Sequence, residues 1–213
     1  MATSNGFTYN RLSVDDAAAL FVDHQSGLIS LVQDFPPGEF KNNVLAFADI
    51  AKFFNLPSVL TTSFEDGPNG PMAPEIRETL PDAPYIPRPG QINAWDNEDF
   101  VRAVEQTGRR QLIIAGVVTD VCVAFPALSA IQAGYQVFAV TDASGTFNEA
   151  VRNSALARMA SAGVQLMNWF CVACELQRDW RNNIEGLGNL LSAHIPGYRN
   201  LMTSYFAVQG AKR

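Results

Sequence analysis

The sequence predicts an α/β protein in which a doubly wound, mainly parallel six-stranded sheet lies between two layers of helices. Two observations favour this three-layer α/β/α, Rossmann-like class. Six apolar runs of strand length recur along the chain, and segments with helical periodicity separate them. Strands that are apolar on both faces and alternate with helices are typical of a parallel sheet covered on each side.

The expected strands are short runs of apolar and β-branched residues at 18–22, 58–62, 85–86, 111–117, 136–141 and 165–169. Right-handed crossovers limit the ways in which such strands can be wound into one sheet. If the strand order is 3-2-1-4-5-6, the first and fourth strands are neighbours at the switch point. Ligands of open parallel sheets bind there, beyond the carboxyl ends of the strands.

Helices are expected at 39–54, 97–107 and 149–162, where apolar residues recur at helical spacing. Polar caps open the second of these helices, and Gly163 closes the third. The segment 67–74 is rich in Gly and Pro and is therefore expected as a loop, which would wall the site.

Length and composition favour one domain. The chain has 213 residues, of which 47% are hydrophobic and 17% charged, and its composition does not shift along the sequence. We therefore expect a single domain over residues 1–213, with a core at about 11–180 and a C-terminal helical tail at about 181–205. The tail carries enough apolar side chains to pack on the domain or on another subunit.

The charge of the chain excludes some classes of partner. A net charge of -6 and an isoelectric point near 4.9 disfavour binding to nucleic acid or to an anionic membrane. The N-terminus is polar and has no apolar stretch of a secretory signal. Three cysteines do not form a disulfide framework, so we expect a cytoplasmic protein.

Cys122 is the candidate nucleophile, because residues 112–125 predict a buried strand, a tight turn and the start of a helix. A helix N-terminus favours the thiolate over the thiol, which makes the sulfur nucleophilic and easily oxidised. Asp23 follows the first expected strand and Arg88 the third. In the strand order above, Asp23 and Cys122 face each other across one crevice.

A cysteine nucleophile needs a base and donors for the oxyanion. Asp23 is the candidate base, and backbone N–H groups in the turn 119–122 are candidate donors. Arg88 keeps its charge and stabilises negative charge without passing a proton. Simpler interpretations stay open: a buried apolar Cys122, a capping Asp23 and a surface-exposed Arg88.

The segments around these residues resemble the isochorismatase-like cysteine hydrolases. They are Leu-Phe-Val-Asp-His-Gln-Ser-Gly-Leu at Asp23, Tyr-Ile-Pro-Arg-Pro-Gly-Gln-Ile-Asn-Ala-Trp-Asp-Asn at Arg88, and Ile-Ala-Gly-Val-Val-Thr-Asp-Val-Cys-Val at Cys122. Segments 141–148 and 173–182 are similar too, and the likeness runs from about residue 11 to about residue 205. Within the superfamily the chain is most similar to the YcaC-type group.

The resemblance implies a triad of Asp23 as general base, Cys122 as nucleophile and Arg88 as electrostatic partner. It also implies a cis peptide bond at Val118-Thr119, with Val118, Thr119 and Cys122 forming the oxyanion hole. Most members have Lys where this chain has Arg88, and a lysine can shuttle a proton. Members that retain the cysteine act on amides, carbamoyl groups or related C–N bonds. YcaC-type proteins form homo-oligomers, commonly octamers.

Four further residues near the expected strand ends are candidates for a substrate pocket. Gln25, Phe64, Gln91 and Trp95 are expected to line a small-molecule pocket, although core or interface positions are equally compatible with them. Cys171 and Cys174 form one C-x-x-C, which lacks the further ligands of a zinc site and is expected to pack.

The two histidines are given no catalytic role. His24 is expected to be structural and His194 to lie on the surface. The chain lacks the histidine cluster by which nicotinamidase relatives hold a metal, and it lacks nucleotide-binding motifs. We therefore expect neither a metal nor a cofactor.

The function predicted is hydrolysis of a C–N bond in a small molecule through a Cys122 thioester. Two alternatives stay open at this point. One is a peroxide-sensitive thiol protein, and the other is a catalytically idle, metabolite-binding oligomer.

Overall fold

The computed structural model describes residues 9–211, and its centre is a six-stranded sheet in which every neighbouring pair is parallel. The strand order is β3-β2-β1-β4-β5-β6, which is the order considered from the sequence. The strands are β1 Ala17–Val22, β2 Ser58–Ser63, β3 Tyr85–Arg88, β4 Gln111–Gly116, β5 Gln136–Val140 and β6 Gln165–Met167.

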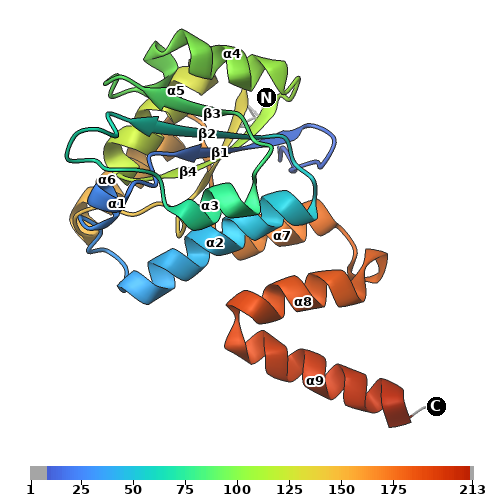
Figure 1. The fold of residues 1–213 in the computed structure, drawn as a ribbon. Coiled ribbons are helices and arrows are strands. Elements are labelled where there is room, and N and C mark those ends of the chain that lie inside the picture. Colours follow the sequence, from blue (N-terminus) through green and yellow to red (C-terminus); the bar gives the residue numbers. More distant parts are fainter. Residues whose placement is uncertain (1–8, 212–213) are drawn as a thin grey trace, which may run out of the picture.

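Helices cover both faces of the sheet, which confirms the predicted three-layer class (Figure 1). One layer contains α2 Pro37–Phe53, α3 Pro74–Thr79 and α7 Trp169–Gln177; the other contains α4 Glu98–Gln106, α5 Ala124–Gln132 and α6 Glu149–Ser161. The short α1 Ser26–Ile29 follows β1, and 3-10 turns lie at Ala94–Asp96 and Trp180–Asn182.

Side chains of β1 alternate between the two cores. Phe21 points into the core under α2, where its ring stacks on Phe47 with 4.5 Å between centroids. Leu20 and Val22 point into the core under α4 and α5. Because both faces of the strand are buried, it is apolar throughout, as the sequence indicated.

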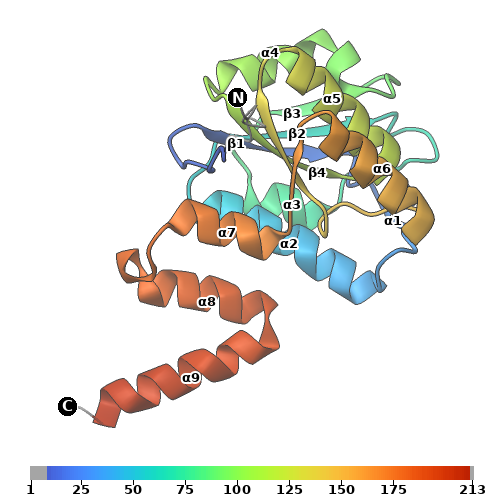
Figure 2. The ribbon, with the colours of Figure 1, turned by 180° about the vertical axis from the view of Figure 1, so that it is seen from behind.

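The C-terminal helices extend the layer below the sheet (Figures 1 and 2). Helix α8 Ile184–His194 lies beside α2, and α9 Pro196–Ala211 folds back against α8 and leads away from the sheet. The surface position predicted for His194 is wrong. Its Nε2 lies 2.8 Å from Oδ2 of Asp49 and its Nδ1 lies 3.1 Å from Oδ1 of Asn42, so it fastens α8 to α2.

Helix α9 keeps much of its apolar surface open, since Leu201, Phe206 and Val208 are exposed. Within residues 9–211, no helix combines the length and the low polarity needed to cross a membrane.

Candidate active site

Asp23, Arg88 and Cys122 meet at the carboxyl edge of the sheet. Asp23 directly follows β1, Arg88 ends β3, and Cys122 lies in the π-helical turn Thr119–Val123 that joins β4 to α5. Asp23 adopts a φ of 57°, a left-handed conformation that is unusual for a residue other than glycine. Such backbone positions cluster at active sites, because the surrounding structure must impose them.

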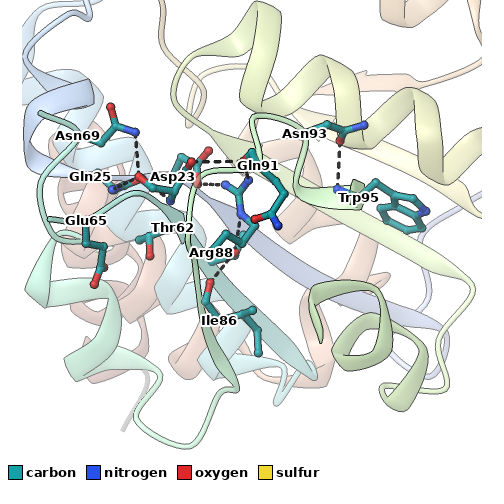
Figure 3. A network of polar contacts seen from close by, with 12 residues as sticks. Asp23, Gln25, Thr62, Glu65, Asn69, Ile86, Arg88, Gln91, Asn93 and Trp95 are labelled. Atoms are coloured by element: carbon teal, nitrogen blue, oxygen red, sulfur yellow. Dashed lines mark hydrogen bonds and ion pairs between the residues drawn. The ribbon is translucent and has the colours of Figure 1, made fainter. Parts of the chain in front are cut away.

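Arg88 is fully engaged inside the protein and is not the surface charge of the simpler interpretation. Its Nη2 donates to Oδ1 of Asp23, and both side chains are completely buried (Figure 3). Its Nε donates to Oγ1 of Thr61 at 3.0 Å, and its Nη1 donates to the carbonyl of Gln91. Each nitrogen of the guanidinium therefore has a protein acceptor.

Cys122 lies against the same carboxyl group. The charge of Asp23 is near enough to raise the pKa of the thiol. Oδ2 of Asp23 has no hydrogen-bond partner among the described residues, so it is free to accept a proton. The simpler interpretation of Cys122 as only a buried apolar residue does not account for a buried carboxylate beside it.

The expected lowering of the Cys122 pKa is wrong for the resting protein. Burial raises the pKa of the thiol well above its usual value, and the charge of Asp23 raises it further. Burial also raises the pKa of Asp23, while Arg88 acts in the opposite direction. Removal of the sulfur from water therefore favours the protonated thiol in the resting protein.

Two of the three N–H groups expected in the oxyanion hole have acceptors in this structure. The N–H of Thr119 donates to the Gly145 carbonyl at 3.0 Å, and that of Cys122 donates to the Val118 carbonyl at 2.9 Å. Within the described residues, the N–H of Val118 has no carbonyl acceptor, and it lies near enough to the sulfur to lower the pKa of Cys122. The cis peptide bond is Val117-Val118, one residue earlier than predicted.

A polar network behind the nucleophile turn was not found from the sequence. Thr146, completely buried, donates its hydroxyl to Oδ1 of Asp120 at 2.7 Å and its N–H to Oδ1 of Asp34 at 2.8 Å. With the Thr119 to Gly145 bond, this network ties the turn to the loop after β5. The segment 141–148 was noted as similar to the family, but Asp34 gave no signal.

The four predicted pocket residues occupy different surroundings. Gln25 is buried and fastens the loop after β2, because its amide bonds both the N–H and the carbonyl of Ser63. Gln91 holds Arg88 through its carbonyl. Phe64 is half exposed beside the site. Trp95 is half-buried and packs edge-on against Phe100 and Tyr135, and Figure 3 shows it apart from the Asp23 and Arg88 pair.

The loop expected to wall the site is attached firmly to the turn after β1. Ser26 and Gly27 donate N–H bonds to the carbonyls of Pro71 and Asn69, and Ala73 donates to His24. A β-carbon on Gly27 would lie 2.1 Å from the Pro68 oxygen, so only glycine permits this approach. The segment is a fixed wall.

His24 is structural, as expected. It is completely buried, its Nε2 lies 3.0 Å from the Ala143 carbonyl, and burial lowers its pKa to about 4. Cys171 and Cys174 are free thiols on α7, the first exposed and the second half-buried. Among the described residues, no group of three His, Cys, Asp or Glu side chains is placed to hold a metal ion.

Comparison with known proteins supports one family. Residues 17–170 match the Isochorismatase domain. The chain is 70% identical over 197 residues to the probable hydrolase YcaC of Escherichia coli (strain K12), covering 92% of this chain and 95% of that one.

Two solved structures are similar over almost their whole length. YcaC from Pseudomonas aeruginosa with hexane-2,5-diol and covalent acrylamide superposes with a TM-score of 0.92 at 70% identity, over 94% of this chain and 99% of that one. The Escherichia coli YcaC product, described as an octameric hydrolase of unknown specificity, has a TM-score of 0.93 at 68% identity, over 95% and 99% of the two chains.

Proposed function

We propose that this chain, which belongs to the isochorismatase family, hydrolyses a C–N bond of a small amide or carbamoyl compound through a Cys122 thioester. The observation that carries the proposal is that a buried Cys122 thiol lies near Asp23, whose charge raises the pKa of the thiol. Arg88 holds Oδ1 of Asp23, and Oδ2 has no partner among the described residues. A nucleophile, a base and a group that orients the base are the parts that acyl transfer requires.

In the first half of the reaction, Oδ2 of Asp23 takes the thiol proton as the sulfur attacks the carbonyl carbon. The N–H of Val118 is available to the oxyanion that forms. The C–N bond then breaks, and the proton on Asp23 passes to the leaving nitrogen. The products of this half are a free amine and an acyl group on Cys122.

Water completes the cycle. Asp23, ionised again, takes a proton from a water molecule that attacks the thioester carbonyl. The C–S bond breaks, the acid leaves, and the sulfur recovers the proton from Asp23. One amide and one water thus give one acid and one amine, and Asp23 acts as base in each half.

Arg88 aligns Asp23 and favours its ionised form. Burial raises the pKa of Asp23, and the guanidinium opposes that rise. Because arginine holds its own proton, Asp23 carries all the proton transfers.

Covalent acrylamide in the Pseudomonas aeruginosa relative supports the presence of a reactive nucleophile in this group. Acrylamide is an electrophile that adds readily to thiolates. A peroxide sensor is less well supported, because sensors need an accessible thiolate at rest and burial raises the pKa of Cys122.

A metabolite screen tests the proposal. Purified protein and its Cys122→Ala variant are incubated with a cell extract, and compounds that disappear only with the unmodified protein are identified by mass spectrometry. An amide or carbamoyl compound replaced by its acid supports the proposal. Equal turnover by the Cys122→Ala variant would refute it.

We also infer a homo-oligomer, by likeness to the octameric Escherichia coli protein and from the apolar residues left exposed on α9. Light scattering of the purified chain measures its mass directly. A monomer at micromolar concentration would refute the inference.

A further inference from the structure

Large apolar side chains stand exposed on three loops at the carboxyl edge of the sheet. Phe64 is 51% exposed after β2, Ile92 is 64% exposed after β3, and Phe147 is 40% exposed after β5. Single exposed apolar residues are common on proteins and need no explanation. The positions of these three relative to Cys122 do need one.

Each of the three, or the residue before it, is hydrogen-bonded to a residue of the candidate site or of the nucleophile turn. The N–H of Phe64 donates to the carbonyl of Arg88 at 3.0 Å. Ile92 follows Gln91, whose carbonyl accepts from Arg88. Phe147 follows Thr146, whose hydroxyl bonds Asp120 in the nucleophile turn.

Sheet order places these loops on both sides of the reactive groups. Asp23 and Cys122 follow β1 and β4, the two central strands, while β3 and β2 lie on one side and β5 on the other. Strands β2 and β5 are three intervals apart, which is about 14 Å at the usual strand spacing. This width suits a small organic molecule.

Phe64 is held in an unusual way. Its φ is 50°, a left-handed conformation that a bulky aromatic residue rarely adopts. Its ring lies over Gly67, where an added β-carbon would come within 2.3 Å of the ring atoms. The protein therefore fixes an aromatic ring in a costly backbone conformation and leaves about half of it open to solvent. Such cost is typical of ligand-contacting residues.

The charges of the site favour an uncharged substrate. Every guanidinium nitrogen of Arg88 already donates to a protein acceptor, and its side chain is fully buried. Arg88 balances the charge of Asp23 but has no nitrogen without an acceptor, so an anionic substrate would bury its charge without a partner of its own. The N–H of Val118, which lies beside the sulfur and has no carbonyl acceptor among the described residues, is a neutral donor.

We propose that the site accepts neutral small amides whose apolar substituent packs against a rim formed by Phe64, Ile92 and Phe147. The inference rests on the proposed function, since it takes Cys122 as the group that the substrate must reach. Phe64 is the main specificity-determining residue, because its ring is the one fixed by both its backbone and Gly67.

Alkylation of Cys122 tests the inference without a known substrate. Iodoacetamide and iodoacetate differ in charge, whereas N-phenylacrylamide and acrylamide differ by an aromatic ring. Rates at Cys122 are measured by peptide mass spectrometry, with the exposed Cys171 of the same molecules as internal reference. Relative to Cys171, Cys122 should favour iodoacetamide over iodoacetate, and N-phenylacrylamide over acrylamide, by about tenfold each.

Substitutions at Phe64 test whether its ring causes the preference for N-phenylacrylamide. Phe64→Ala should lower the ratio of N-phenylacrylamide to acrylamide rates about tenfold. Phe64→Asn suits the left-handed backbone and should give the same loss, which separates ring removal from misfolding. Leu166→Ser, at an exposed residue of the edge strand β6, should leave the ratio unchanged.

An unchanged ratio in both Phe64 variants, or equal reaction with the two iodo compounds, would overturn the inference alone. If no electrophile modified Cys122 while Cys171 reacted, the proposed function would fail together with it.

Discussion

Cys122 and Cys171 both lie in the opening turn of a helix, yet they differ in what surrounds the sulfur. Cys171, in the first turn of α7, donates its N–H to the capping Asn168 and is exposed to solvent. Cys122 is buried beside Asp23. Burial raises the pKa of both thiols, and the nearest carboxylate raises each further.

Position near the start of a helix is therefore shared by the two cysteines and does not identify the nucleophile. Burial and a nearby carboxylate raise the pKa in both cases. What distinguishes Cys122 is a base placed to take its proton during the attack, so its reactivity is coupled to the arrival of an electrophile. The two cysteines can therefore be compared experimentally through matched variants.

The largest effect is expected from removal of the nucleophile. Cys122→Ala should lower turnover of the substrate found in the screen about 10⁴-fold or more, because catalysis by the remaining residues is small. Cys171→Ala, a matched change at an exposed thiol, should retain full activity. Steady-state kinetics of the two variants measure this difference in turnover. Similar losses of turnover in both would contradict a special role for Cys122.

Asp23→Asn should have the next largest effect. Loss of a general base lowers rates about 10²- to 10⁴-fold, and alkylation of Cys122 should slow relative to Cys171. The change also leaves the buried charge of Arg88 without its counter-ion, so the free energy of unfolding should fall by about 3 kcal/mol or more.

A double variant separates these two consequences of the Asp23 change. Asp23→Asn with Arg88→Gln removes both charges, and it should regain stability in urea unfolding without regaining activity. Recovery of the rate together with the stability would show that Asp23 matters only for folding.

The network behind the turn should have a smaller influence. Thr146→Val deletes the hydroxyl that bonds Asp120 while keeping the shape of the side chain, and we expect about a tenfold slower alkylation of Cys122. Thr146→Ser retains the hydroxyl and should restore the rate. Equal slowing in both variants would point to lost packing instead of a lost hydrogen bond.

Substitution of Asp142 should have the smallest effect on the reactivity of Cys122, and its main effect should be on stability. The side chain of Asp142 accepts the N–H of Trp169 at the start of α7. Burial raises its pKa to about 6. The folded protein therefore binds more protons here than the unfolded chain between about pH 4 and 6, and its stability falls as pH rises through that window. The free energy of unfolding should fall by about 2 to 3 kcal/mol in all as pH rises through this window.

Asp142→Asn removes this titration and keeps the acceptor for Trp169. Relative to the unmodified protein, the variant should gain about 2 to 3 kcal/mol of unfolding free energy between pH 4 and pH 7. Urea melts at several pH values measure the difference. Alkylation of Cys122 should be unchanged, and a constant difference in stability across pH would contradict the assignment.

Much of the fold follows from local patterns. All six strands, and the helices expected at 39–54, 97–107 and 149–162, were recognisable from buried apolar runs and helical spacing, with end positions off by one or two residues. The short strand Tyr85–Arg88 was found in part, since Pro87 interrupts its pattern.

The site was predictable only as far as strand ends are predictable. Asp23, Arg88 and Cys122 follow strands, so sheet order brings them together. The pKa of Cys122 was not predictable, because it depends on burial by segments distant in sequence. The roles of Thr146 and Asp34 were equally hidden, since 112 residues separate the two partners of that hydrogen bond.

The central claim is that Cys122, and not either cysteine of α7, carries the acyl group. Acid quenching during reaction with 4-nitrophenyl acetate, followed by peptide mass spectrometry, tests it most directly. The account predicts an acetyl group on the peptide containing Cys122, released by hydroxylamine, formed and hydrolysed in the time of one turnover and absent in Cys122→Ala. Acetylation of Cys171 or Cys174 with none at Cys122, or undiminished turnover by Cys122→Ala, would contradict it.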